Sequence, residues 1–191
     1  DYEAIWEQLQ LEIPEHYNFG FDVIDEVAKD PGRIAYIAVD ATGETVVPHS
    51  FDDLSKRSNR FANWMNELGV NKGDLAFVMI PRLPAWYEVM IGSCKCGVVS
   101  MPATNLLTPK DIEYRIQKTG ARVAIVTLDG ATKVDEIRAS CPTLEYFIIV
   151  DGERDGWLGF EDGLDSCSDS FRPNESTLSA ELMLVYFTSG T

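Results

Sequence analysis

The chain has 191 residues, of which 45% are hydrophobic and 25% are charged, so it has enough apolar residues for a folded core and too many for a disordered tail. Sixteen Lys and Arg residues against 31 Asp and Glu residues give a formal net charge of −15, which argues against binding along a nucleic-acid backbone. No stretch approaches the roughly 20 apolar residues of a membrane-spanning helix, and four cysteines are too few for a disulfide scaffold of this length.

The first regular elements that the sequence predicts are a hairpin and an amphipathic helix. Residues 34–39 and 45–47 flank a turn-rich link, which indicates a β-hairpin. Ser50-Phe51-Asp52-Asp53 matches a capping box with Asp in its last position. Apolar residues then recur on one helical face as far as Leu68, and Gly69 stands where the helix should end.

Four short apolar runs follow, and they predict the strands of a sheet. Their starts are 23, 25 and 23 residues apart, about the length of one strand, one helix and two loops. They are apolar at consecutive positions, as expected for parallel strands that are covered on both faces. The runs are residues 75–80, 98–101, 123–127 and 146–150. We therefore expect an α/β fold with a mainly parallel sheet flanked by helices.

The segments between these runs carry helix signals. Pro84 opens a helix that extends to about Cys96 and is apolar nearly all round, which predicts deep burial. Thr108-Pro109-Lys110-Asp111 supplies the N-cap, the N1 proline and the N3 acid of another helix, which Gly120 ends. Residues 129–139 are a weaker fourth candidate.

The last part of the chain changes character twice. Residues 151–170 contain seven acidic residues, one basic residue and four glycines, and we interpret them as a solvated surface excursion. An apolar run at 182–187 then predicts a strand, which leads directly into Thr188-Ser189-Gly190-Thr191.

A strand that leads into a Thr/Ser/Gly loop is suited to binding phosphate. Glycine lets backbone N–H groups approach an anion, and short hydroxyl side chains donate to its oxygens. Taken alone, these four residues fit a plain turn after an edge strand better. Neither G-x-x-x-x-G-K-[ST] nor G-x-G-x-x-G occurs in the chain.

Longer sequence blocks favour the phosphate interpretation. Residues 184–191 (LVYFTSGT) resemble the start of the signature of adenylate-forming enzymes, a strand followed by T-S-G-T-T-G-x-P-K. Residues 49–54 (HSFDDL) resemble the earlier T-Y-x-E-L block of that superfamily, and residues 92–102 (GSCKCGVVSMP) resemble its L-K-A-G-x-x-x-x-P block. The superfamily comprises acyl-CoA synthetases, peptide-synthetase adenylation domains and luciferases.

One branch of the superfamily is the most similar. Residues 81–87 (PRLPAWY) resemble the P-R-x-P-E-W-W of medium-chain acyl-CoA synthetases. Residues 99–104 and 111–116 resemble that group's G-x-x-F-M-P-G-T and D-I-x-Y-R-L blocks. The resemblance extends from about Tyr17 to Thr191. The departures are Ala85 for Glu, Tyr87 for Trp and Ala103 for Gly.

The resemblance implies that residues 1–191 are the first α/β subdomain of a large N-terminal AMP-binding domain. The rest of the phosphate loop, most of the acyl pocket and the C-terminal catalytic domain would lie outside this chain. The intact enzyme would be an AMP-forming acid–thiol ligase that uses ATP, Mg²⁺ and CoA to activate a short- or medium-chain carboxylic acid. We expect the 191-residue chain alone to be inactive, with no bound cofactor.

The resemblance also assigns the site residues. Thr188, Ser189, Gly190 and Thr191 are implied to bind the β- and γ-phosphates of ATP. In the medium-chain group a polar residue near Leu106 contacts CoA, and because Leu106 is apolar, we assign it a backbone contact only. No catalytic residue and no metal ligand is expected within the chain.

Several alternatives stay open. Trp86 and Tyr87 fit plain core better than contact with an acyl chain or CoA, and Arg82 fits a carboxylate partner better than a phosphate. Another adenylate-forming enzyme, such as an aryl-CoA ligase or an adenylation domain, would differ in its acyl pocket. A non-enzymatic α/β interaction module with a coincidental terminal loop is the remaining class. The oligomeric state is also open, including a homo-oligomer.

The cysteines and histidines lack the spacing of a metal site. Cys94 and Cys96 form a C-x-C pair, whereas His16 and His49 lie far away in the sequence. We interpret the cysteines as reduced, partly buried thiols. The opening Asp1-Tyr2-Glu3 is the reverse of a basic signal peptide, so the sequence predicts a cytoplasmic protein.

Overall fold

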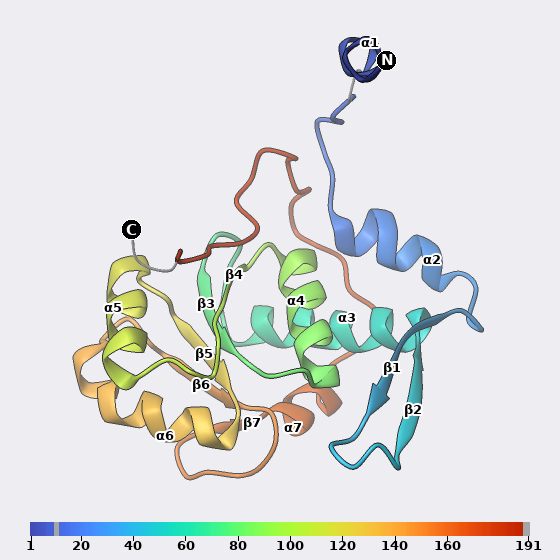
Figure 1. Cartoon of the computed structure of the whole chain (residues 1–191). Coiled ribbons are helices and arrows are strands. Elements are labelled where there is room, and N and C mark those ends of the chain that lie inside the picture. The colour runs from blue at the N-terminus through green and yellow to red at the C-terminus, as the bar shows by residue number, and fades with distance from the viewer. Residues whose placement is uncertain (10–11, 189–191) are drawn as a thin grey trace.

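The computed structural model describes residues 1–9 and 12–188, and its centre is a five-stranded parallel sheet (Figure 1). The strand order is β4-β3-β5-β6-β7, and every neighbouring pair is parallel. The strands are β3 (Leu75–Met79), β4 (Val99–Pro102), β5 (Val123–Val126), β6 (Tyr146–Ile149) and β7 (Leu158–Gly159). The first four coincide with the four apolar runs, so the predicted parallel sheet is confirmed.

Helices cover both faces of the sheet, which is why its strands are apolar at consecutive positions. On one face, α3 (Phe51–Glu67), α4 (Pro84–Cys96) and α7 (Phe160–Asp165) pack over one apolar cluster. On the other, α5 (Pro109–Thr119) and α6 (Leu128–Ile137) pack over a second cluster. Figure 1 shows the sheet between these two layers of helices.

The predicted hairpin and caps are also confirmed. Strands β1 (Ile34–Val39) and β2 (Val46–Ser50) pair in antiparallel fashion. Ser50 begins α3 and Thr108 begins α5, each with a complete capping box. The Oγ of Ser50 accepts a hydrogen bond from the Asp53 N–H at 3.0 Å, so the helix starts where the sequence indicated.

Short helical segments complete the described chain. They are α1 (Tyr2–Gln8), the π-helical turn η1 (Gly20–Asp25), α2 (Glu26–Ala28) and the 3₁₀ turn η2 (Arg138–Ser140). No helix among the described residues is long and apolar enough to cross a membrane.

The interpretation of residues 151–170 as a solvated excursion is wrong. This segment contains β7, which extends the sheet beside β6, and α7, which packs on α3. Trp157, Phe160 and Leu164 are buried in the two cores. The acidic residues concealed this outcome because they are exposed, whereas Trp157, Phe160 and Leu164 of the same segment point inward.

The prediction of a strand at 182–187 is wrong in extent. Only one parallel bridge forms, between Ser100 of β4 and Leu184. The next residue of β4 that should donate to the segment is Pro102, which has no N–H. The ladder therefore stops after one step.

The prediction that α4 is buried on every side needs a correction as well. Its polar side chains Glu88 and Lys95 are buried, whereas Tyr87 is 40% exposed. These two charged residues of α4 point inward because α3 and η1 supply polar partners for them. Part of its apolar surface is consequently left at the surface.

Candidate functional site

The segment that carries the predicted phosphate loop runs beside the edge strand β4. The Ser100 N–H donates to the carbonyl oxygen of Met183 at 3.2 Å, and the Val185 N–H donates to the carbonyl oxygen of Ser100 at 3.0 Å. After Val185 the segment reaches α5, on the far side of the strand (Figure 1). Thr188 is exposed at the end of the described chain, and Ser189, Gly190 and Thr191 lie outside the described residues.

The side chain before Thr188 fixes the segment against α5. The ring of Phe187 lies edge-on to Tyr114, with their centroids 6.0 Å apart. The guanidinium carbon of Arg115 lies 5.1 Å from the centroid of the same ring. Phe187 and Val185 also pack against the apolar cluster beneath α5 and α6. The position of Thr188 thus depends on side-chain packing more than on a strand ladder.

Leu106 lies in the loop between β4 and α5, at the carboxyl end of β4. Its side chain is 88% exposed, and its N–H donates to the Oγ1 of Thr104 at 3.3 Å. Lys133 of α6 donates to the carbonyl oxygen of Asn105 at 2.6 Å, which holds the loop against α6. Among the described residues no hydrogen bond joins Leu106 to Thr188.

The aromatic residues of α4 pack against other parts of the fold. Tyr87 stacks on Tyr36 of the hairpin with ring centroids 4.5 Å apart, and Tyr36 stacks in turn on His49 at 4.6 Å. Trp86 packs against the first apolar cluster. The prediction of plain core therefore agrees with the place of Trp86 and is wrong for Tyr87, which is 40% exposed and packs on the hairpin. Arg82 is exposed after β3.

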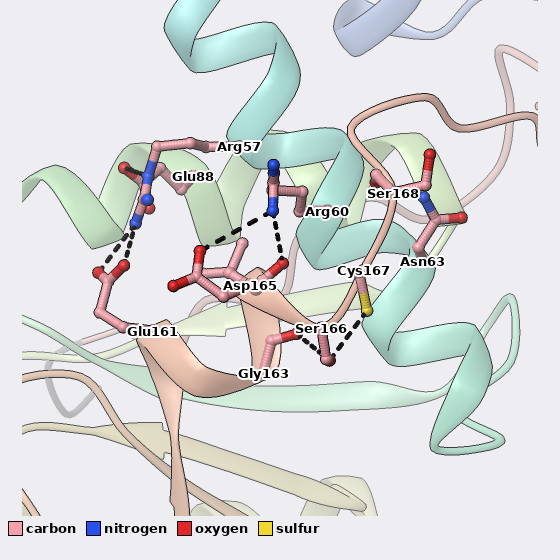
Figure 2. Close-up of polar contacts among 11 residues, drawn as sticks. Arg57, Arg60, Asn63, Glu88, Glu161, Gly163, Asp165, Ser166, Cys167 and Ser168 are labelled. Atoms are coloured by element: carbon pink, nitrogen blue, oxygen red, sulfur yellow. Dashed lines mark hydrogen bonds and ion pairs between the residues drawn. The ribbon is translucent and has the colours of Figure 1, made fainter.

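An ion-pair network centred on Arg57 ties α3 to the buried Glu88 of α4 and to the exposed Glu161 of α7, and sequence reasoning missed it. The Arg57 Nε lies 2.6 Å from the Oε1 of Glu88, which is only 2% exposed, and Arg57 also donates to both oxygens of Glu161 at 2.8 and 2.9 Å. Figure 2 shows Arg57 between these two carboxylates. Burial raises the pKa of the Glu88 carboxyl above its ordinary value, and the hydrogen bond and charge of Arg57 oppose that rise.

The segment after α7 is held to α3 by further polar contacts. Arg60 donates to the carbonyl oxygen of Leu164 at 3.2 Å, and Asn63 donates to that of Ser168 at 2.8 Å (Figure 2). These hydrogen bonds tie the end of α7 and the chain after it to the side of α3.

The fully buried Lys95 is the second missed polar residue. Its Nζ lies 2.6 Å from the Oδ1 of Asp25 and 2.7 Å from the Oδ1 of Asn59, so it joins η1, α3 and α4. Burial lowers the pKa of Lys95, and Asp25 opposes that shift. The signal was available, because Glu88 and Lys95 are the two charged residues in an otherwise apolar helix.

The clearest hollows lie away from both predicted binding segments. Two adjoining cavities of about 570 and 310 Å³ share Gly97, Glu181 and Leu182 in their linings, at the amino-terminal end of β4. No group of three or more His, Cys, Asp or Glu residues in the described chain is placed to hold a metal ion.

Comparison with known proteins places these observations in a family context. The model of a family described as AMP-binding enzyme matches residues 24–191. Human acyl-coenzyme A synthetase ACSM5, mitochondrial, is 35% identical over 199 residues, which cover 98% of this chain and 34% of that protein. Acyl-coenzyme A synthetase ACSM4, mitochondrial, from Rattus norvegicus is 35% identical over 199 residues, with 100% and 34% covered.

Solved structures share the fold. An acyl-CoA synthetase from Brucella canis superposes with a TM-score of 0.83 at 22% identity, over 100% of this chain and 35% of that one. The anthranilate CoA ligase AuaEII, solved with anthranoyl-AMP, superposes with a TM-score of 0.81 at 23% identity, over 93% of this chain and 33% of that one. The chain thus spans about a third of the length of the proteins it matches.

Proposed function

The chain belongs to the AMP-binding enzyme family, and from this membership we propose that it is part of an AMP-forming acyl-CoA synthetase. The observation that carries the proposal is the family match over residues 24–191, which includes the segment leading into the phosphate loop. Relatives 35% identical to the chain carry the name acyl-coenzyme A synthetase, which supports this choice within the family.

The proposed reaction has two steps. A carboxylate oxygen of a short- or medium-chain acid attacks the α-phosphorus of ATP, and the bond to the pyrophosphate oxygen breaks to give acyl-AMP. The sulfur of CoA then attacks the acyl carbonyl carbon, and AMP leaves. In the first step, backbone N–H and hydroxyl groups of residues 188–191 donate to the β- and γ-phosphates and stabilise the charge of the departing pyrophosphate.

Other roles follow from the same proposal. Leu106 contacts CoA through its backbone, and its carbonyl oxygen is the group that remains for this purpose, because its N–H already bonds to Thr104. Mg²⁺ arrives with ATP, and we assign it no ligand in this chain. Residues 1–191 form the first α/β subdomain of the AMP-binding domain, and the intact protein is active as a monomer or a homo-oligomer.

For the compartment we propose the cytoplasm, since all four cysteines are free thiols. The names of the relatives include the word mitochondrial, which makes mitochondria the competing location. Immunodetection of the protein in fractionated cells of its source distinguishes the two.

The test of the activity uses the protein encoded by the complete gene. We expect ATP-dependent pyrophosphate release with butyrate or octanoate, followed by AMP and thioester when CoA is added. The same assay with benzoate identifies an aryl-CoA ligase. Absence of pyrophosphate release with every carboxylate contradicts the proposal, and pyrophosphate release by the 191-residue chain alone contradicts its assignment as a partial enzyme.

Variants of the loop locate the site. Gly190→Val adds a branched side chain where backbone must approach phosphate, and we expect pyrophosphate release to fall severely. Thr188→Ala or Thr191→Ala removes one donor, a change that typically costs on the order of 10²-fold. The matched control is Thr143→Ala, because Thr143 is an exposed threonine outside the loop. Full activity in Gly190→Val would exclude this loop from the reaction.

A further inference from the structure

The backbone of β4 does not hold the residues immediately before the phosphate loop. The ladder between β4 and the C-terminal segment ends with the hydrogen bond from the Val185 N–H to the Ser100 carbonyl. In a parallel pair the following donor would belong to Pro102, which has none. Within the described chain, no further backbone hydrogen bond joins Tyr186, Phe187 or Thr188 to β4.

Beyond the end of this ladder, side chains of α5 contact the C-terminal segment. The half-buried ring of Phe187 is contacted by Tyr114 at its edge and by Arg115, with the distances of 6.0 and 5.1 Å given above. Arg115 is itself fixed, because its Nη1 donates to the carbonyl oxygen of Asp111 one turn earlier at 2.9 Å. The guanidinium therefore meets the ring from a defined direction, as an arginine stacked on an aromatic residue does.

We propose that Tyr114 and Arg115 are positioning residues for the phosphate loop, and that they act on it through Phe187. We call these three residues the Phe187 cluster. The cluster sets where the chain enters the loop, one residue before Thr188, because the strand ladder has already ended. This inference rests on the proposed function. It adds α5 as the element that orients the loop for adenylation.

The cluster makes a specific prediction about the two half-reactions. Acyl-AMP formation needs the loop to orient pyrophosphate, and misplacement by about 1 Å can cost as much as 10²-fold. Thioester formation from supplied acyl-AMP does not involve the β- and γ-phosphates. Arg115→Ala should therefore lower kcat for pyrophosphate release on the order of tenfold, with the KM for the carboxylate and the thioester step unchanged. A merely structural defect would lower both half-reactions together.

Companion variants identify the contact. Arg115→Lys keeps the charge but loses the planar stacking group, so we expect little rescue. Phe187→Tyr keeps the ring and should stay active, whereas Phe187→Leu should resemble Arg115→Ala. The double variant Arg115→Ala with Phe187→Leu should release pyrophosphate no more slowly than either single variant, because both substitutions remove the same interaction. Lys118→Ala is the control, since Lys118 is an exposed cation on the same helix.

A second measurement does not depend on activity. In the complete protein, Arg115→Ala should speed amide hydrogen exchange at Val185, whose N–H donates to the Ser100 carbonyl oxygen, about two- to fivefold, the range expected for loss of an exposed cation–π contact. Exchange in α3 and β5 should not change.

Unchanged exchange at Val185 in Arg115→Ala would overturn the positioning role, and so would fully additive losses when Arg115→Ala is combined with Phe187→Leu. If the wild-type protein releases no pyrophosphate, the proposed function fails, while the exchange measurement still decides whether the Phe187 cluster holds this segment.

Discussion

Gly92 lies where α4 packs closely on α3, and a single methyl group there tests how tightly the two helices pack. A Cβ at residue 92 would lie 2.6 Å from the Cδ1 of Phe61 and 2.8 Å from the carbonyl oxygen of Ser58. Phe61 is fully buried, and the Ser58 oxygen belongs to the backbone of α3. Neither atom can move away without displacing a helix or a core ring.

The expected cost follows from these contacts. Overpacking a close-packed core costs about 1–3 kcal/mol, whereas Gly→Ala inside a helix recovers up to about 1 kcal/mol of propensity. Because one clash is with backbone, we expect Gly92→Ala to lower the free energy of unfolding by about 1–2 kcal/mol. For a domain of this size that lowers Tm by about 2–8 °C.

The assay is thermal unfolding of the purified protein, followed by near-ultraviolet circular dichroism. Gly32→Ala is the matched control, because its added Cβ would meet only the Oδ1 of Asp30 at an ordinary 3.7 Å. If Gly92→Ala unfolds at or above the wild-type temperature, the close packing of α3 on α4 is refuted.

Three further predictions concern charge, capping and the strand edge. Burial raises the folded-state pKa of Glu88, so the wild type should lose stability relative to Glu88→Gln as the pH rises above 4.5. A difference in unfolding free energy between the two proteins that does not change with pH would contradict this. Ser50→Ala should destabilise the protein by about 1 kcal/mol in urea titrations. The hydrogen bond from Ser50 also lowers the pKa of Asp53, so loss of this bond should make the unfolding free energy less sensitive to acidification below the ordinary carboxyl pKa. An unchanged dependence of the unfolding free energy on acidic pH in Ser50→Ala would count against this prediction. Pro102→Ala supplies the missing N–H and should slow amide exchange just beyond Val185; faster or equal exchange would show that the proline does not end the ladder.

Elements whose signals are local could be predicted from the amino-acid sequence. A capping box at Ser50, an N1 proline at Pro109 and consecutive apolar residues at 123–126 act through neighbours within a few residues, so strands β3–β6 and helices α3–α6 were predictable. The family blocks likewise pointed to adenylate-forming chemistry, because they are contiguous in sequence.

Features that depend on residues far apart in the sequence became visible in the folded chain. Glu88 and Lys95 are buried in α4 because Arg57 and Asp25, 31 and 70 residues away, compensate their charges. An acidic segment became β7 and α7 because α3 offered a surface for its few apolar side chains. The run at 182–187 failed to form a full strand because its neighbour in space is Pro102, a residue that no local pattern associates with it.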